Sequence, residues 1–374
     1  MEKILIIPHH PALPNIKIRL VEIARSLSRQ YSVYLVSWRA AQERHSLRLR
    51  LFLALKDIFV KSKVYKKGAL NIVEFPILHR PLCFVPKFNS FWLERIIEKE
   101  KIDVVINGSY YMFSIPGKRD FKYIFDIPDL PVEQTKTYFD RFISQQTKRE
   151  LEKADAITVS SGGLLNYVSQ NYYKQALFIP NGADIEKLRS VGQAELDKIR
   201  QRYNLAGKWV IGYIGHIGSW VNIDLLIGVF KEIKKNTENA VLFIVGSCPG
   251  PLKRRFSMEG VIFTNGINSD EIDAYFSAID LGIIPSRKSL FQDLAFHLKA
   301  IEYTAARKFI VATPSEEMQR LNFPNFIFAK EEKGAWVRAI EKARQMRWDE
   351  RWDSLIDDYD WSKISQKFIG IIRS

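Results

Sequence analysis

The sequence predicts an α/β protein built from two doubly wound domains, each with a parallel β-sheet between layers of helices. Three observations support this fold class. The chain has 374 residues, more than a single domain usually contains. Short apolar segments of strand length recur along it, separated by segments with helical periodicity. A Pro-Asn-Gly turn at residues 180–182 breaks this alternation near its middle.

The first half of the chain carries the first series of these segments. Helices are expected at Ile16–Arg29 and Ser90–Lys101. Strands are expected, in order, at Lys3–Pro8, Ser32–Ser37, Asp103–Asn107, Tyr123–Asp126, Ala156–Ser160 and Ala176–Pro180.

A second series follows the Pro-Asn-Gly turn. Strands are expected at Trp209–Gly215, Ala240–Gly246, Val261–Asn265, Leu281–Pro285, Phe309–Ala312 and Asn325–Ala329. Helices are expected at Ile223–Asn236, Ser269–Ala278, Leu294–Ala306 and Gly334–Arg347. The expected domains are therefore 1–180 and 181–355, followed by a capped final helix within 356–374.

Composition limits the classes of function. The net charge is +14, of which residues 1–190 contribute +11 and residues 191–374 only +3, so an anionic partner of the first half is expected, against the alternative of a solvated basic face. Two cysteines in no metal pattern favour a reducing cytosol. No signal peptide or bilayer-spanning run is recognisable. No zinc, RNP or helix-turn-helix signature supports nucleic-acid binding.

Glycines follow two strands of the second series. Gly215 and Gly246 each end an apolar strand, and such turns let a ligand approach the backbone at the carboxyl edge of a sheet. No GxGxxG or GxxxxGK[ST] pattern is present, so neither a nicotinamide cofactor nor a P-loop is indicated. Asp358-Tyr359-Asp360 has the form of a metal-binding DxD, but it follows no buried strand and is set aside. No cofactor and no metal are expected.

Seven segments, taken in order, resemble the retaining glycosyltransferases of the large group 1 (family 4) class. They are Lys153–Ser161, Ile179–Leu188, Ile211–Ile227, Val241–Ser247, Asn265–Arg287, Leu298–Thr313 and Tyr359–Phe368. The resemblance covers the second half of the chain well and the first half poorly. It implies the GT-B fold, in which two Rossmann-like domains face a cleft and a C-terminal helix crosses back to the first domain.

The resemblance also implies a nucleotide-sugar site in the second domain. Glu302 occupies the place of the glutamate that binds the ribose hydroxyls, and a carboxylate with two acceptor oxygens suits a diol. Lys299 lies one turn earlier on the same helix face and is expected on the phosphate side; the alternative is a surface ion pair between the two. The expected donor-binding residues are Gly215, His216, Gly246, Ser247, Ile267, Arg287, Lys299 and Glu302.

The sequence departs from the family at three positions. Leu294 stands where a glutamate is common at the donor sugar, and the neighbouring Asp293 is the expected substitute. His216 and Val221 stand where an arginine and a lysine clamp the diphosphate, which leaves Arg287 and Lys299 as candidates. Asp126 corresponds to a position that contacts the donor sugar in relatives, whereas Asp129 is expected to be a turn cap. The expected catalytic residues are Asp126, Asp293 and His216.

The first domain is expected to bind the acceptor. Its first strand leads into a loop with His9, His10 and Asn15, which either bind sugar or phosphate or form a solvated turn. The resemblance implies metal-independent transfer of a hexosyl unit from a UDP- or GDP-sugar to a glycan or lipid-linked acceptor, with retention, in bacterial-type surface polysaccharide assembly. The alternative is a non-catalytic GT-B subunit that binds an acceptor or partner.

Residues 39–67 suggest contact with a membrane. They hold nine basic and two acidic residues, a net charge of +7, interleaved with apolar side chains. This mixture is typical of an amphipathic helix on an anionic bilayer, and equally of a helix packed on its own domain. We expect a protein that is cytoplasmic and peripheral on the inner face of the cell membrane.

Overall fold

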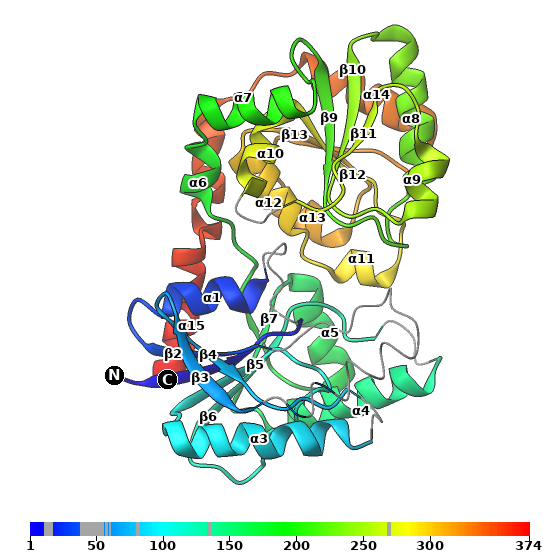
Figure 1. The fold of residues 1–374 in the computed structure, drawn as a ribbon. Helices are drawn as coiled ribbons and strands as arrows, with labels where there is room; N and C mark the ends of the chain where they lie inside the picture. The colour runs from blue at the N-terminus through cyan, green and yellow to red at the C-terminus, as the bar shows by residue number, and fades with distance from the viewer. Residues whose placement is uncertain are drawn as a thin grey trace. The chain divides into compact units, whose positions relative to one another are not determined.

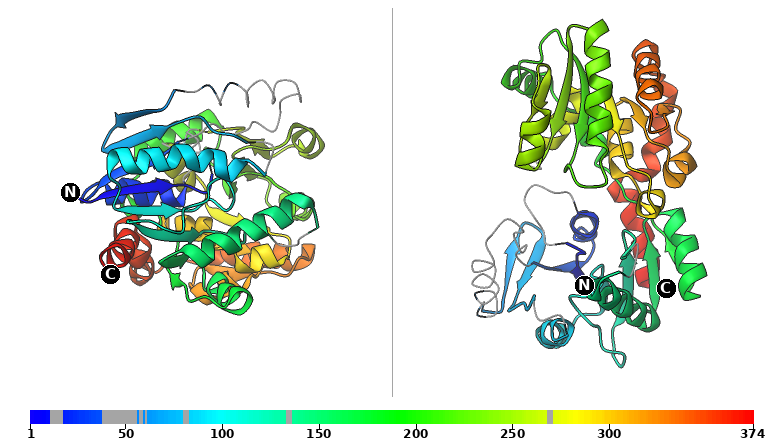
Figure 2. Two further views of the ribbon diagram at one scale, coloured as in Figure 1. Left: turned by 90° about the horizontal axis from the view of Figure 1, so that it is seen from below. Right: turned by 90° about the vertical axis from the view of Figure 1, so that its right-hand side faces the viewer.

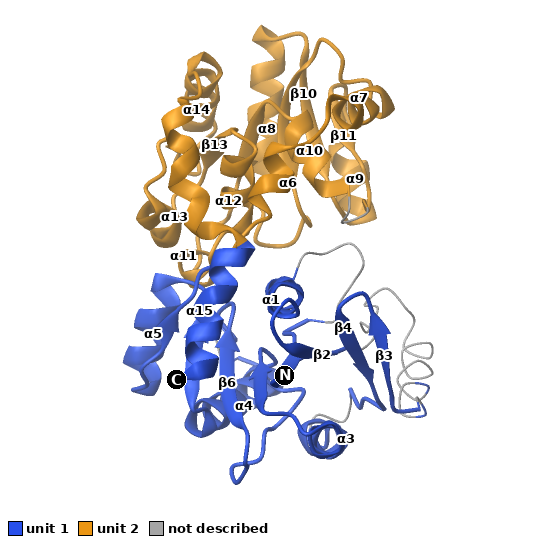
Figure 3. Ribbon diagram, turned by 90° about the vertical axis from the view of Figure 1, so that its left-hand side faces the viewer, with its two compact units in different colours: residues 1–181, 361–374 blue, residues 182–360 orange. Residues whose placement is uncertain are grey.

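The computed structural model describes residues 1–10, 18–37, 56, 59, 61–79, 83–132, 136–267 and 271–374. The chain divides into two compact units (Figure 3). Unit 1 consists of Met1–Asn181 with Trp361–Ser374, and unit 2 of Gly182–Asp360. Among the described residues, no helix combines the length and the apolar character needed to span a bilayer.

Unit 1 contains a sheet with the strand order β3-β4-β2-β1-β5-β6-β7-β8. All neighbouring strands are parallel except β3 and β4, which form an antiparallel pair at one edge. The strands are β1 (Lys3–Ile7), β2 (Ser32–Val36), β3 (Lys63–Lys67), β4 (Leu70–Glu74), β5 (Val104–Asn107), β6 (Lys122–Ile127), β7 (Ala156–Val159) and β8 (Leu177–Phe178). The six strands expected from the sequence are confirmed.

Helices cover both faces of this sheet (Figure 1). Helices α1 (Arg19–Leu27) and α15 (Trp361–Arg373) lie side by side on one face, where the Ser26 and Ser365 hydroxyl groups are 2.7 Å apart. Helices α3 (Val85–Glu100), α4 (Tyr138–Lys153) and α5 (Gly162–Tyr172) lie on the other. The C-terminal helix therefore completes the unit that begins the chain.

The helix expected within residues 39–67 is wrong for Lys63–Lys67. Lys63–Lys67 forms strand β3, whose side chains are mostly exposed and which pairs with Leu70–Glu74. A strand with this exposure is stabilised by its hydrogen bonds to β4 and not by burial, so its apolar pattern is weak. Arg39, Arg44, Arg48 and Arg50 lie outside the described residues.

Unit 2 contains a fully parallel sheet with the strand order β11-β10-β9-β12-β13-β14. All six strands expected in the second series are confirmed. They are β9 (Trp209–Ile214), β10 (Ala240–Val245), β11 (Val261–Phe263), β12 (Leu281–Ile284), β13 (Phe309–Ala312) and β14 (Phe326–Phe328). Because the strands are parallel, their carboxyl ends meet at one edge of the sheet, where ligands bind in such folds.

Side chains on the two faces of this sheet enter separate cores. Tyr213 and Ile244 pack toward α8 (Ile223–Asn236) and α14 (Lys333–Gln345), which lie beside one another in Figures 1 and 2. Ile214 and Phe243 face the opposite core. That core is formed with α6 (Ile185–Arg189), α7 (Gln193–Arg202), α10 (Ile272–Ala278), α12 (Leu298–Ala305) and α13 (Glu316–Leu321).

The helix expected at Leu294–Ala306 is two helices. Helix α11 (Leu290–Leu294) ends at Ala295, whose extended backbone (ψ 135°) stops it, and α12 starts after His297. Two further short elements belong to unit 2, α9 (Gly250–Phe256) and the 3-10 helix Glu350–Tyr359. Helix α6 begins after Asp184, whose side chain accepts a hydrogen bond from the Lys187 amide.

Candidate functional site

The glycines that end β9 and β10 have backbone conformations that L side chains rarely adopt. Gly215 has φ +143° and Gly246 has φ +123°. A Cβ on Gly246 would lie 2.5 Å from the Gly215 carbonyl oxygen, so the two strand exits are in close contact. These positions require glycine, because a side chain at Gly215 would collide with Lys299 and one at Gly246 with the Gly215 backbone.

Lys299 brings a positive charge to this edge. Its Nζ donates a hydrogen bond of 3.0 Å to the Tyr213 hydroxyl and lies 4.5 Å from the centre of the Tyr213 ring. A Cβ on Gly215 would approach Nζ to 2.5 Å. Among the ion pairs of the described residues, none gives Lys299 a carboxylate partner, so the surface pair with Glu302 is not formed. The cation is therefore available to an anion near the β9 turn.

Glu302 lies one turn further along α12. Its side chain is 6% exposed, although carboxylates are rarely buried to this degree. The next residue fixes α12 against β9, because the Tyr303 hydroxyl donates to the Gly212 carbonyl and accepts from the Ile214 amide, both at 3.0 Å. The helix that carries Lys299 and Glu302 is thus attached to the strand that ends in Gly215.

His216 and Ser247 follow the two glycines and are in contact. The His216 Nδ1 lies 2.6 Å from the Ser247 Oγ, and both residues are exposed. The Trp220 ring lies 5.7 Å from the His216 ring. His216 stands in the place where the family resemblance implies an arginine, and an imidazole N–H and a serine hydroxyl can both donate hydrogen bonds to phosphate or sugar oxygens.

Arg287 is exposed after β12 and lies 3.7 Å from Asp224, a residue that also pairs with Arg255 at 2.6 Å. Its guanidinium group is therefore only partly neutralised. Val221 is buried and forms an isolated antiparallel bridge with Ser286, so it has a structural role. Ile267 is partly buried and packs against the core that contains α12.

Asp293 lies in α11 with a partly buried side chain. Burial, and secondarily the nearby Glu316, raises the pKa of Asp293, while Lys288 opposes the shift. Leu294 is buried at 7% exposure, and its apolar side chain cannot replace the glutamate that the family resemblance implies at this position. His297, which the sequence did not single out, contacts the Gln292 carbonyl at 3.2 Å, and burial lowers the pKa of this imidazole to about 4.

Asp126 in unit 1 is part of a buried network of hydrogen bonds and an ion pair. Its carboxylate is fully buried, forms an ion pair with Arg19 (3.0 Å) and accepts 2.7 Å from the Thr158 hydroxyl. Arg19 also donates to the Pro180 carbonyl at 2.8 Å and to the Asn181 side chain at 3.1 Å. This network joins α1, β6 and β7 to Pro180 and Asn181, where the first segment of unit 1 ends.

His9, His10 and Asp129 lie at the carboxyl edge of the first sheet. The His9 and His10 rings are 4.7 Å apart, and burial, aided by His10 and Arg19, lowers the pKa of His9 to about 3. Burial raises the pKa of the Asp129 carboxyl group to about 7, an effect that Arg19 opposes and Asp126 reinforces. Sequence reasoning missed this shift, because it comes from the fold and not from a motif. Asn15 lies outside the described residues.

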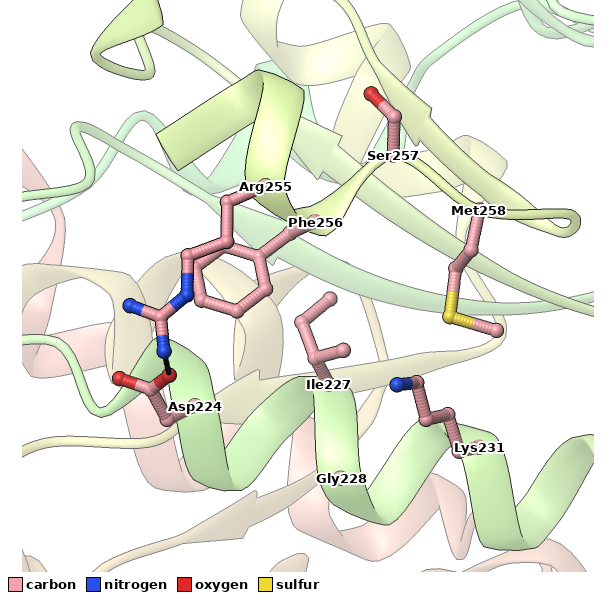
Figure 4. A pocket seen from close by; sticks show the side chains of 8 residues that line it. All are labelled: Asp224, Ile227, Gly228, Lys231, Arg255, Phe256, Ser257 and Met258. Atoms are coloured by element: carbon pink, nitrogen blue, oxygen red, sulfur yellow. Dashed lines mark hydrogen bonds and ion pairs between the residues drawn. The ribbon is translucent and has the colours of Figure 1, made fainter. Parts of the chain in front are cut away.

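A hollow of about 350 Å³ lies elsewhere on unit 2, between α8 and α9 (Figure 4). The residues that line it include Asp224, Lys231, Arg255 and Met258, and none of the expected donor-binding residues is among them. In the residues that the structure describes, no group of three or more metal-binding side chains is present. Asp360 accepts a hydrogen bond from the Ile185 amide, as expected of a structural residue.

The two parallel sheets correspond to the GT-B fold. Sucrose-phosphate synthase from Thermosynechococcus elongatus matches all of this chain and 98% of its own, with a TM-score of 0.74 and 17% sequence identity. HepE from Anabaena, in complex with UDP-glucose, matches with full coverage of both chains, a TM-score of 0.70 and 14% identity.

The family model of the glycosyl transferases group 1 matches residues 208–345, which lie within unit 2. A putative teichuronic acid biosynthesis glycosyltransferase of Bacillus subtilis, TuaH, is 26% identical over 216 residues, which are 54% of this chain and 52% of that protein. The chain spans about half the length of the curated relatives it matches.

Proposed function

We propose that this protein is a glycosyltransferase that moves a hexosyl unit from a UDP- or GDP-sugar to a glycan or lipid-linked acceptor. The observation that carries the proposal is the placement of Lys299 beside the Gly215 turn, one helical turn from the buried Glu302. The Anabaena structure that shares the fold holds UDP-glucose, which supports a nucleotide-sugar donor.

Each group at the carboxyl edge of the second sheet binds a different part of the nucleotide-sugar donor in this proposal. The glycine turns admit the diphosphate to the backbone, Lys299 and Arg287 offset its negative charge, and Glu302 accepts hydrogen bonds from the ribose hydroxyls. Positive side chains and backbone N–H groups stabilise the leaving diphosphate as the acceptor hydroxyl attacks, with retention at the anomeric carbon. Asp293 and His216 are the proposed groups at the donor sugar.

The test of the donor site is a pair of substitutions, Glu302→Gln and Lys299→Met. A charge-assisted hydrogen bond contributes about 1.5–3 kcal/mol, so each variant should lose tenfold or more in kcat/KM for the donor. Glu341→Gln and Lys342→Met, on α14, are matched controls that should leave donor kinetics unchanged. Unchanged kinetics in the α12 variants, with an unchanged melting temperature, would contradict the site assignment.

A second candidate is a non-catalytic GT-B subunit that binds an acceptor or partner. It is favoured by Leu294 and Val221, apolar and buried at positions where the family resemblance implies charged groups. Thermal protection and hydrolysis across a panel of nucleotide sugars separate the two. Protection together with sugar release supports the transferase, whereas the absence of both supports the subunit.

We further propose that unit 1 binds the acceptor through His9, His10 and Asn15, and that the protein acts in surface polysaccharide assembly at the inner face of the cell membrane. The name of the Bacillus relative supports a polysaccharide acceptor. Contact with an anionic bilayer through residues 39–67 remains part of the proposal. Neutralising Arg44, Arg48, Arg50, Lys61 and Lys63 together should weaken binding to anionic vesicles at low salt without changing donor affinity.

A further inference from the structure

The hollow between α8 and α9 of unit 2 has the size and the apolar lining of a ligand site (Figure 4). Its volume is about 350 Å³, and protein pockets that hold small molecules measure roughly 300–1,000 Å³. Ile227 and Phe256, both buried, and the partly buried Met258 form its apolar lining. A ligand with an apolar body would therefore have side chains to pack against.

Gly228 leaves space at the α8 side of this hollow. Glycine in the interior of a helix is less stable than alanine, so its presence at this position needs a reason. A Cβ at Gly228 would meet no atom closer than the Lys333 Cδ at 3.9 Å, so close packing does not require the glycine. Gly228 lines the hollow, and a binding site accounts for the missing side chain.

Lys231 brings a positive charge to the hollow. In Figure 4 its ammonium group points into the space between the two helices. Among the ion pairs of the described residues, none includes Lys231. The nearby carboxylates pair with other cations, because Glu232 lies 3.1 Å from Lys235 and Glu259 lies 4.0 Å from Lys234. The Lys231 charge is therefore available to an anion.

Arg255 supplies a second cation. Its guanidinium lies 4.7 Å from the centre of the Phe256 ring and 2.6 Å from the Asp224 carboxylate. Asp224, the acidic residue among those that line the hollow, is shared with Arg287 at 3.7 Å. A guanidinium has five N–H donors, so one contact with Asp224 leaves donors for a second anion. Residues 224–259 hold six basic and four acidic residues, which leaves a net positive charge.

We infer that the hollow between α8 and α9 binds a small anion with an apolar body, a compound that carries a phosphate or carboxylate group on a ring. Lys231 and Arg255 pair with the anionic group, and Ile227, Phe256 and Met258 contact the ring. The net positive charge disfavours a cation, and the apolar lining favours a ring over a bare inorganic anion. The inference does not depend on the proposed transferase activity, and none of these residues belongs to the proposed donor site.

Phenyl phosphate is the probe, because it joins one aromatic ring to one phosphate group. Titration calorimetry of the full chain at low salt should detect its binding, and high salt should weaken it. Inorganic phosphate and phenol should each bind about tenfold more weakly or worse, since each lacks one half of the recognised structure. In protein labelled at the methionine methyl groups, the Met258 resonance should shift on titration with phenyl phosphate. Its absence from the Met258→Gln spectrum assigns this resonance.

Two pairs of variants locate the site. Lys231→Met should weaken phenyl phosphate binding by about tenfold or more, whereas Lys235→Met, on the same helix and paired with Glu232, should bind like the wild type. Met258→Glu should also weaken binding by about tenfold or more, because it places a like charge beside the anion. Met258→Gln, which has the same shape without the charge, should stay within about threefold of the wild type.

The Lys299→Met variant separates this site from the proposed donor site. It should bind phenyl phosphate like the wild type. Binding that is lost in Lys299→Met and kept in Lys231→Met would place the probe at the Gly215 turn and overturn the inference. A Met258 resonance that does not shift would overturn it as well, as would unchanged affinity in both Lys231→Met and Met258→Glu with an unchanged melting temperature.

Discussion

The ion pair between Arg19 and Asp126 is closed to solvent, so its loss has a predictable effect on stability. Asp126→Asn should lower the free energy of unfolding by about 3–5 kcal/mol, because the Arg19 guanidinium remains buried without its counter-charge. Urea denaturation measures this difference. A variant that keeps its stability and loses turnover would instead favour the sugar-contacting role that the family resemblance implies for Asp126.

The raised pKa of Asp129 predicts that the free energy of unfolding falls as the pH rises. Burial raises the pKa of its carboxyl group from 3.8 to about 7, so the folded chain holds this proton more tightly than the unfolded chain. Its contribution to stability is full below about pH 4 and is lost as the pH rises through 7. Asp129→Asn should therefore gain stability over the wild type at pH 8.5 by on the order of 1 kcal/mol or more, and much less at pH 4. Equal differences at the two pH values would contradict the raised pKa.

Sequence motifs predicted the candidate site residues of unit 2 better than those of unit 1. Gly215, Lys299 and Glu302 fall within strand-turn and helix patterns that are local in the sequence, and the structure places the first two in contact. The partners of Asp126 are 107 and 32 residues away, and no local pattern records them. The same holds for Tyr213, whose hydroxyl positions Lys299 across 86 residues.

Among the secondary-structure elements, the turn after β9 has the strictest backbone requirement. Gly215→Ala should destabilise unit 2 by about 1–3 kcal/mol, because φ +143° is strained for alanine, and its Cβ would displace the Lys299 ammonium. Gly228→Ala in the middle of α8 is the control. Its nearest neighbour is Lys333 at 3.9 Å, so better helix propensity should stabilise the protein by about 0.5–1 kcal/mol. Thermal denaturation of both variants tests the contrast, and stabilisation in both cases would be incompatible with a required glycine.

The strands of both sheets that are buried on two faces were predictable, because a continuous apolar run is a strong signal. The hairpin of β3 and β4 was missed. Lys63–Lys67 contains three lysines, and its position at the sheet edge comes from pairing with β4. The break between α11 and α12 was missed as well, since Ala295 and Phe296 fit a helical pattern while the backbone at Ala295 is extended.

At the scale of the whole molecule, the stability of unit 1 depends on helix α15. Trp361, Ile364, Phe368 and Ile372 of α15 are buried in the core that contains β1, β2 and α1. Truncation after Asp357 should give poorly soluble or inactive protein, because an apolar surface on α1 would be uncovered. Phe368→Ala should cost about 3–5 kcal/mol, whereas Lys367→Ala, exposed on the same helix, should cost little. A truncated protein that stays monomeric with an unchanged melting temperature would show that α15 is dispensable.

The return of α15 also constrains the order of events during synthesis. Ser26 and Ser365, whose hydroxyl groups are in contact, are 339 residues apart, so unit 1 is completed only after all of unit 2 has been synthesised. Unit 2 is fully synthesised before helix α15 and can fold first. Until α15 has been synthesised, the apolar surface of unit 1 that it covers stays exposed. During this interval, chaperones can bind that face before helix α15 covers it.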